Sequence, residues 1–133
     1  MKICKKCNKN IRKGNICKKC KKNKKKTTQK YFKKLEKQER NKKDKLWSIE
    51  VKTRDNNICV ICSSGKLIHT HHIIPRENKK FRHDIDNGVS LCPLHHKYSY
   101  EISAHKNSLM FIIWLQENRK EQLNMLMIKL RIF

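Results

Sequence analysis

Apolar residues are sparse over the first 45 positions of the chain and become regularly spaced only after them. From Thr27 or Thr28 onward, the few apolar side chains stand among residues that favour helices. We therefore predict a long basic helix that reaches about Arg54, with any break near Asn41. Because the apolar stripe is so thin, a disordered tether that becomes helical only on DNA or RNA stays open as the alternative.

The C-terminal end of this helix carries a clearer apolar face. Trp47, Val51 and Ile58 mark that face, and the helix is predicted to end near Asn56 and Asn57. An apolar face on an otherwise polar helix indicates packing against a core. The globular part of the chain is therefore expected to begin close to Trp47.

The central region predicts two short strands and a further helix. Residues 66–72 alternate well enough for a strand, and Pro75 prevents its continuation as a central strand. The polar segment 76–86 is expected to be a loop, and Val89–Leu91 to be the second strand. Pro93 then stands at the first turn of a helix.

The C-terminal residues 105–133 predict one amphipathic helix, which Ser108 is placed to cap. Its apolar positions follow helical spacing; they are Leu109, Ile112, Ile113, Leu123, Leu126, Met127 and Leu130. This helix is expected to complete a small core or to form the seam of a dimer.

Composition narrows the picture. The chain has 133 residues, enough for one ordinary domain or for a small domain with an appendage. Hydrophobic residues make up 37%, and chains with so small a core usually need a metal, disulfides or a partner. The 34 Lys and Arg against 11 Asp and Glu give a formal charge of +23, which favours a polyanionic partner.

The sequence also bears on location. The longest apolar run, Leu109–Leu115, is too short to span a bilayer, and the first residues lack an apolar stretch of signal-peptide length. We therefore expect no membrane association and a place in the cytoplasm, or in the host cytoplasm for a viral protein. The seven cysteines are an odd number, and in a reducing compartment C-x2-C pairs more often bind metal than form disulfides.

Residues 1–20 contain two such pairs, which predict a zinc-knuckle module. Four thiolates satisfy tetrahedral zinc, and the three isoleucines of this segment are too few to fold it without metal. The alternative is a set of reduced thiols on a disordered basic tail. The four cysteines are Cys4, Cys7, Cys17 and Cys20.

Residues 21–45 form a basic segment that is either helical or a disordered linker. Its lysines are suited to contact phosphate without reading sequence, and we expect DNA to be the partner. Tyr31 and Phe32 could stack on bases, although packing is the simpler role. The predicted phosphate contacts are Lys21, Lys22, Lys24, Lys25, Lys26, Lys30, Lys33 and Lys34.

The region after Trp47 holds the residues that suggest chemistry. In order, they are Cys59-x2-Cys62, His71-His72-Ile73-x-Pro75, Asn87 and Cys92-x2-His95-His96. This order and spacing resemble the zinc-stabilised form of the HNH endonuclease family, found widely in phages and mobile elements. The resemblance covers about residues 46–101. It implies an α+β fold: a ββα-metal core at 46–104, with the N-terminal zinc-knuckle and basic extension and the C-terminal helix added to it.

The resemblance also implies roles for individual residues. His71 and His96 would bind a catalytic divalent ion (Mg²⁺, Mn²⁺, Ni²⁺ or Zn²⁺), and two imidazoles favour borderline metals over magnesium. His72 would be the general base, and Asn87 would pin the loop and orient His72 through a hydrogen bond. An imidazole with a pKa near 6.5 suits this task at neutral pH.

A structural zinc site is predicted beside this centre. Cys59, Cys62 and Cys92 supply three thiolates, and His95 stands where family members usually have a fourth cysteine. Three thiolates and one imidazole make a sound zinc site. Because residues adjacent on a helix differ by about 100° in direction, His95 and His96 can face different metals.

Other readings of the same residues stay open. His71, His72 and His96 could form a second zinc site without catalysis. His69 could be a third ligand or a phosphate contact, though an ordinary half-exposed histidine is the simpler reading. His83 could touch DNA, and we expect His105 to lie on the surface.

Two classes of function compete. We expect a metal-dependent DNA endonuclease, either nicking or cutting both strands, that acts as a monomer or homodimer. The alternative is a non-catalytic zinc-containing nucleic-acid-binding protein, for instance an RNA-binding protein of the ribosome. That alternative would not require the His-His, Asn and His residues at this spacing.

Overall fold

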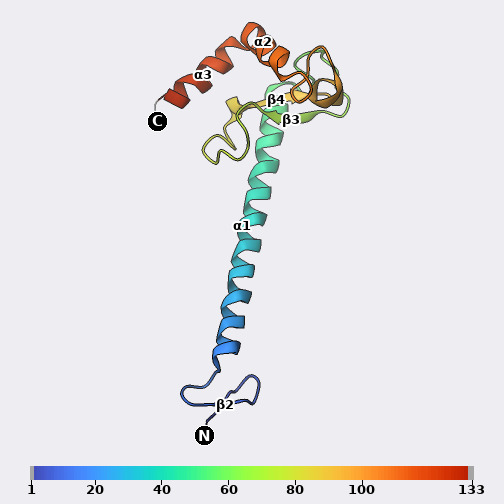
Figure 1. The fold of residues 1–133 in the computed structure, drawn as a ribbon. Coiled ribbons are helices and arrows are strands. Elements are labelled where there is room, and N and C mark those ends of the chain that lie inside the picture. Colours follow the sequence, from blue (N-terminus) through green and yellow to red (C-terminus); the bar gives the residue numbers. More distant parts are fainter. Residues whose placement is uncertain (1, 132–133) are drawn as a thin grey trace. The chain divides into compact units, whose positions relative to one another are not determined.

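The computed structural model describes residues 2–131, with the side chains of Lys24 and Lys25 outside the described part. Those two predicted phosphate contacts therefore lie outside the described residues. The chain divides into two compact units, residues 1–42 and residues 43–133. Helices and two small sheets together make a mixed α+β structure (Figure 1).

The first unit opens with a two-stranded antiparallel sheet. Strand β1 (Lys2–Ile3) pairs with β2 (Asn10–Ile11). The chain turns between them at Asn8, which has a positive φ of 54°, a conformation that asparagine tolerates better than most residues. This hairpin brings the first cysteine pair close to the second.

Helix α1 (Lys18–Arg54) is continuous for 37 residues (Figure 1). It begins about nine residues before the predicted start at Thr27, and Asn41 does not interrupt it. The helix starts early because the Cys17–Cys20 knuckle is its first turn, with the Lys21 amide donating to the Cys17 carbonyl at 3.0 Å. Lysine is itself a good helix former, and its charged end stays in water.

The second unit is built on a hairpin of β3 (His69–His72) and β4 (Gly88–Leu91), which pair antiparallel. Strand β3 is shorter than the predicted 66–72. Leu67 has a positive φ of 51°, which is incompatible with extended backbone. A 3₁₀ turn, η1 (Ile85–Asn87), leads into β4, and a short π-helix, η2 (Leu94–Tyr98), follows it with Pro93 at its N-cap.

The end of α1 packs closely on this hairpin. Trp47 and Val51 are buried, as their spacing predicted, and the helix ends before Asn56 and Asn57, both with positive φ. A Cβ atom on Gly88 would lie 2.4 Å from a Val51 methyl carbon, so the absent side chain lets helix and strand approach.

The C-terminal segment forms two helices, not the single helix predicted. Helix α2 (Ser108–Asn118) and helix α3 (Lys120–Arg131) are separated at Arg119 (Figure 1). The break lets the Arg119 guanidinium reach the buried carboxylate of Asp55 at 3.3 Å. The N-cap is Asn107, whose side chain accepts from the Met110 amide; Ser108 is the first helical residue.

These two helices close the core and buttress the turn before β4. Phe111 and Leu115 of α2 join the buried cluster that contains Val89 and Leu91. From α3, the Gln122 amide donates to the carbonyls of Asp86 and Gly88, and Lys129 pairs with Asp84 and Asp86. The C-terminal segment is therefore part of the core, as one of the two predictions for it proposed.

No helix among residues 2–131 combines the length and apolarity that a membrane crossing requires.

Candidate metal centres and active site

The four N-terminal cysteines converge on one point. The Sγ atoms of Cys4, Cys7, Cys17 and Cys20 lie within 4.8 Å of one another. The Cys7 and Cys17 sulfurs are 3.6 Å apart, whereas ligands of tetrahedral zinc with bonds of about 2.3 Å are separated by about 3.8 Å. The donor set and its spacing therefore fit zinc.

Hydrogen bonds around this cluster favour metal binding. The Cys17 amide donates to the Cys4 sulfur at 3.2 Å, and this bond contributes most to lowering the pKa of Cys4 to about 6. The neighbouring thiol of Cys17 raises the pKa of Cys20 to about 12. Without a cation the four thiols cannot all ionise together, so zinc binding would release protons.

A second cluster lies beside the β3–β4 hairpin. Cys59, Cys62, Cys92 and His95 bring their ligand atoms within 4.8 Å of one another. The Cys62 and Cys92 sulfurs are 3.8 Å apart, and the Nδ1 atom of His95 lies 3.3 Å from the Cys92 sulfur. These separations also suit tetrahedral zinc.

This second cluster separates the two adjacent histidines. Burial lowers the pKa of His95, so its imidazole is neutral and available as a ligand. His96 belongs to a different group of side chains on the same short helix. The two histidines thus belong to different groups of potential ligands.

The third cluster consists of histidines alone. His71 of β3, His96 of η2 and His105 from the loop before α2 bring ring nitrogens within 4.8 Å of one another. The Nε2 atoms of His96 and His105 are 3.2 Å apart, close to the separation of about 3.3 Å expected for imidazoles on one zinc-like ion. Three nitrogen donors suit a borderline divalent metal.

Burial favours the neutral form of two of these rings, His71 and His96. It lowers the pKa of His71 to about 3 and that of His96 to about 4, and the neighbouring imidazoles push both values in the same direction. A neutral imidazole presents the lone pair that a metal requires. The cluster is therefore ready to accept a cation at neutral pH.

His105 is a potential ligand that sequence reasoning missed. It was expected on the surface, and its side chain is indeed exposed, yet its ring lies 5.0 Å from that of His71. The backbone brings it there because the His105 amide donates to the His96 carbonyl at 3.2 Å. The only signal in the sequence was the confinement of all seven histidines to positions 69–105.

His72 lines the same cleft from the next position of β3. Its Nε2 atom lies 2.9 Å from the Arg82 carbonyl oxygen, and its ring stacks on the Trp47 indole at 3.9 Å. Burial lowers the pKa of His72, against the effect of the Arg82 carbonyl. Burial thus favours the neutral form of the ring.

Asn87 fastens the loop that follows β3. It is fully buried, and its Oδ1 atom accepts from the Ile74 amide at 2.6 Å. Its Nδ2 atom donates to the carbonyls of Ile74 and Phe81, both at 2.9 Å. Asn87 thus fastens the loop. It was also expected to form a hydrogen bond with His72, but the partner of the His72 ring is the Arg82 carbonyl.

The cleft is open and carries basic residues on its rim. Besides His71, His72, His96 and His105, it is lined by Thr70, Ile73, Pro75, Arg76, Glu77 and Lys97. Arg76 and Lys97 give the rim a positive character that suits a phosphate backbone. The open cleft therefore brings together the three clustered histidines, His72 and two basic side chains.

Two further histidines lie outside the cluster of His71, His96 and His105. The ring of His69 stacks 5.7 Å from that of His96, but His69 does not belong to the group of three. The Nε2 atom of His83 is 2.8 Å from the Asp44 carboxylate. His83 therefore has a partner within the protein.

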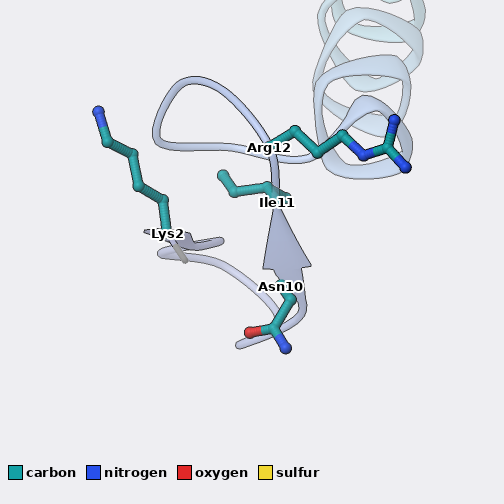
Figure 2. A pocket seen from close by; sticks show the side chains of 4 residues that line it. All are labelled: Lys2, Asn10, Ile11 and Arg12. Atoms are coloured by element: carbon teal, nitrogen blue, oxygen red, sulfur yellow. The ribbon is translucent and has the colours of Figure 1, made fainter.

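The first unit offers a shallow hollow rather than a built site. It is lined by Lys2, Asn10, Ile11 and Arg12. Figure 2 shows that the side chains of Lys2 and Arg12 point away from each other. Two diverging cations around an open hollow do not define a binding site.

Six of the predicted phosphate contacts are exposed along α1: Lys21, Lys22, Lys26, Lys30, Lys33 and Lys34.

Comparison with known families adds one finding. Residues 52–99 match the family model described as HNH endonuclease. This segment resembles the HNH endonucleases, as the sequence predicted. It contains His71, His72, Asn87 and His96, while His105 lies beyond its end. No curated protein matches the chain significantly, and no solved structure does either.

The match supports nuclease activity at the level of the family. HNH proteins share a ββα-metal architecture, and the hairpin of β3 and β4 followed by η2 has the corresponding order. The two cysteine-containing clusters could hold zinc, and the histidine cluster could hold a further divalent ion.

Proposed function

We propose that this protein is a metal-dependent DNA endonuclease in which His72 is the general base. The observation that carries the proposal is the meeting of His71, His96 and His105 at one point, with His72 lining the same cleft. A single cleft thus presents a cation site and a neutral base, which phosphodiester hydrolysis requires.

Each residue would have a defined task. A divalent ion held by His71, His96 and His105 would polarise the phosphodiester and stabilise the charge that develops on it. His72 would take a proton from the attacking water through its free ring nitrogen. Arg76 and Lys97, on the rim, would hold the phosphates on either side of the scissile bond.

The ligand set bears on the choice of ion. Three imidazoles without a carboxylate favour Ni²⁺, Zn²⁺ or Mn²⁺ over Mg²⁺, which prefers oxygen ligands and retains its waters. We therefore expect activity with the borderline metals at lower concentrations than with Mg²⁺. The zinc ions of the two cysteine-containing clusters would remain bound throughout.

DNA binding is proposed to rest largely on the basic residues of α1. The exposed lysines Lys30, Lys33 and Lys34 lie within four positions of one another, hence along about one turn of helix. Such residues provide affinity for any duplex through counterion release. Monomer and homodimer are both compatible with this function.

The decisive experiment is nicking of supercoiled plasmid across several divalent ions, with wild type and His72→Ala compared. We expect His72→Ala to lose about 10²–10⁴-fold in rate, while its zinc content and DNA affinity stay at the wild-type level. Cleavage by His72→Ala at the wild-type rate would remove His72 from the mechanism. A wild type that binds DNA but never cleaves it would favour the non-catalytic nucleic-acid-binding protein.

A further inference from the structure

Helix α1 contacts three consecutive residues of the loop between β3 and β4. The Asp44 carboxylate accepts two hydrogen bonds from the Arg82 guanidinium, at 2.7 and 2.6 Å. The same carboxylate lies 2.8 Å from Nε2 of His83. One helical turn later, the Trp47 indole donates to the Asp84 carbonyl at 2.8 Å.

The same helix and the same loop also hold the ring of His72. The Arg82 carbonyl oxygen lies 2.9 Å from Nε2 of His72, and the Trp47 ring lies parallel to the imidazole within 15°. A carbonyl oxygen only accepts hydrogen bonds. The proton of the neutral imidazole must therefore be on Nε2, which leaves the basic lone pair on Nδ1.

We infer that Asp44 is a positioning residue for His72, acting through Arg82. By holding the Arg82 side chain, the carboxylate fixes the carbonyl that selects the tautomer and the orientation of the His72 ring. This inference rests on the proposed function, in which His72 is the base. Asp44 itself would touch neither substrate nor metal.

The pair has the geometry of an anchor rather than of an incidental surface contact. It is bidentate, and the side chains of Asp44 and Arg82 are 32% and 17% exposed. The guanidinium also donates to the Arg76 carbonyl at 3.1 Å, so it joins two parts of the loop that are six residues apart. Bidentate carboxylate–arginine pairs fix geometry as well as contributing energy, whereas exposed pairs contribute little.

The test compares Asp44→Asn with Glu50→Gln in the full-length chain. Both substitutions remove one negative charge from α1, but Glu50 is exposed on the helix. We expect Asp44→Asn to lower kcat about tenfold or more with KM unchanged or reduced, because a displaced base slows the chemical step and not binding. Glu50→Gln should keep the wild-type kcat. Equal kcat values for the two variants would overturn the inference.

A second variant tests the route through Arg82. Arg82→Gln should lower kcat to a similar extent, and the double variant with Asp44→Asn should lose no more than either alone, because the two residues act as one unit. Losses that multiply in the double variant would contradict the route.

Nitrogen NMR of the His72 ring in the zinc-loaded chain provides a readout independent of cleavage. We expect the Nε2–H tautomer in wild type and a mixture of tautomers in Asp44→Asn. An Nδ1–H tautomer in wild type would overturn the inference. Because this measurement uses wild type alone, it decides the question even if the variants fail to fold. If wild type showed the Nε2–H tautomer but no cleavage with any ion, the proposed function would fail and the positioning of His72 would stand.

Discussion

His105 completes the donor set of the histidine cluster. His71 and His96 come from the hairpin and from the helix after it, and two imidazoles alone would hold a divalent ion weakly. The third ring reaches them because a backbone hydrogen bond returns the chain from η2 to the cluster. Although exposed, this one side chain is expected to decide how tightly the ion is held.

The substitution His105→Ala tests this role. We expect the affinity of the cluster for Ni²⁺ or Mn²⁺ to fall about tenfold or more, since it loses one of three ligands, while both zinc ions stay bound. Nicking should recover when the ion concentration is raised. Titration of nicking activity with the ion measures the effect.

His69→Ala is the matched control, because His69 also stacks near His96 but lies outside the group of three. Its titration curve should resemble that of wild type. If both variants needed the same increase in ion concentration, His105 would not be a ligand of the ion.

At the scale of elements, the approach of α1 to β4 controls the position of Trp47. The helix can lie close to the strand only because Gly88 has no side chain. A Cβ atom at this position would meet Val51 at 2.4 Å and the Trp47 ring at 2.8 Å. Since Trp47 stacks on His72, the packing distance between helix and strand also affects the position of the His72 ring.

Gly88→Ala is therefore expected to destabilise the second unit by about 1–3 kcal/mol, the usual cost of overpacking a core. It should also reduce nicking, because the Trp47 ring has to move. Urea unfolding followed by tryptophan fluorescence measures the first effect. Gly65→Ala is the control, since a Cβ there meets no atom closer than 3.9 Å, and its stability should stay near that of wild type.

The sequence predicted local groupings well and tertiary ones poorly. C-x2-C spacing indicated both cysteine-containing clusters, because each pair is formed within a single turn. It gave no sign that Asp44 reaches Arg82, 38 residues away, or that Trp47 covers His72. The early start of α1 and the break at Arg119 also escaped prediction, because each depends on a partner that only the folded chain supplies.

At the scale of the whole molecule, charge and chemistry lie in different units. Residues 1–42 hold 19 of the 34 Lys and Arg and only 2 acids, while the histidine cluster and His72 belong to residues 43–133. Asp44 and Trp47 also belong to the second unit. The unit that holds the histidine cluster thus begins at Lys43, although α1 is one helix.

Replacing Lys30, Lys33 and Lys34 together by glutamine tests the role of the basic unit. Glutamine favours helix about as well as lysine, so α1 should persist. The slope of log K against log salt for duplex DNA should become shallower by about 0.9 for each phosphate that the variant no longer neutralises. Fluorescence anisotropy at several salt concentrations provides the measurement.

The same three positions changed to arginine keep the charge and form the control, whose slope should match that of wild type. An unchanged slope in the glutamine variant would move phosphate binding to other residues, such as Arg76 and Lys97 on the cleft rim.

The three histidines of the third cluster come from three separate stretches of the chain: β3, η2 and the loop before α2. An ion shared among them would act as a removable cross-link. Because the ion would bind only the folded form, raising its concentration should raise the melting temperature. The free energy of unfolding should increase by about 2.7 kcal/mol at an ion concentration of a hundred times the dissociation constant. The melting temperature would then report how much of the histidine cluster is occupied by the ion, without any DNA present.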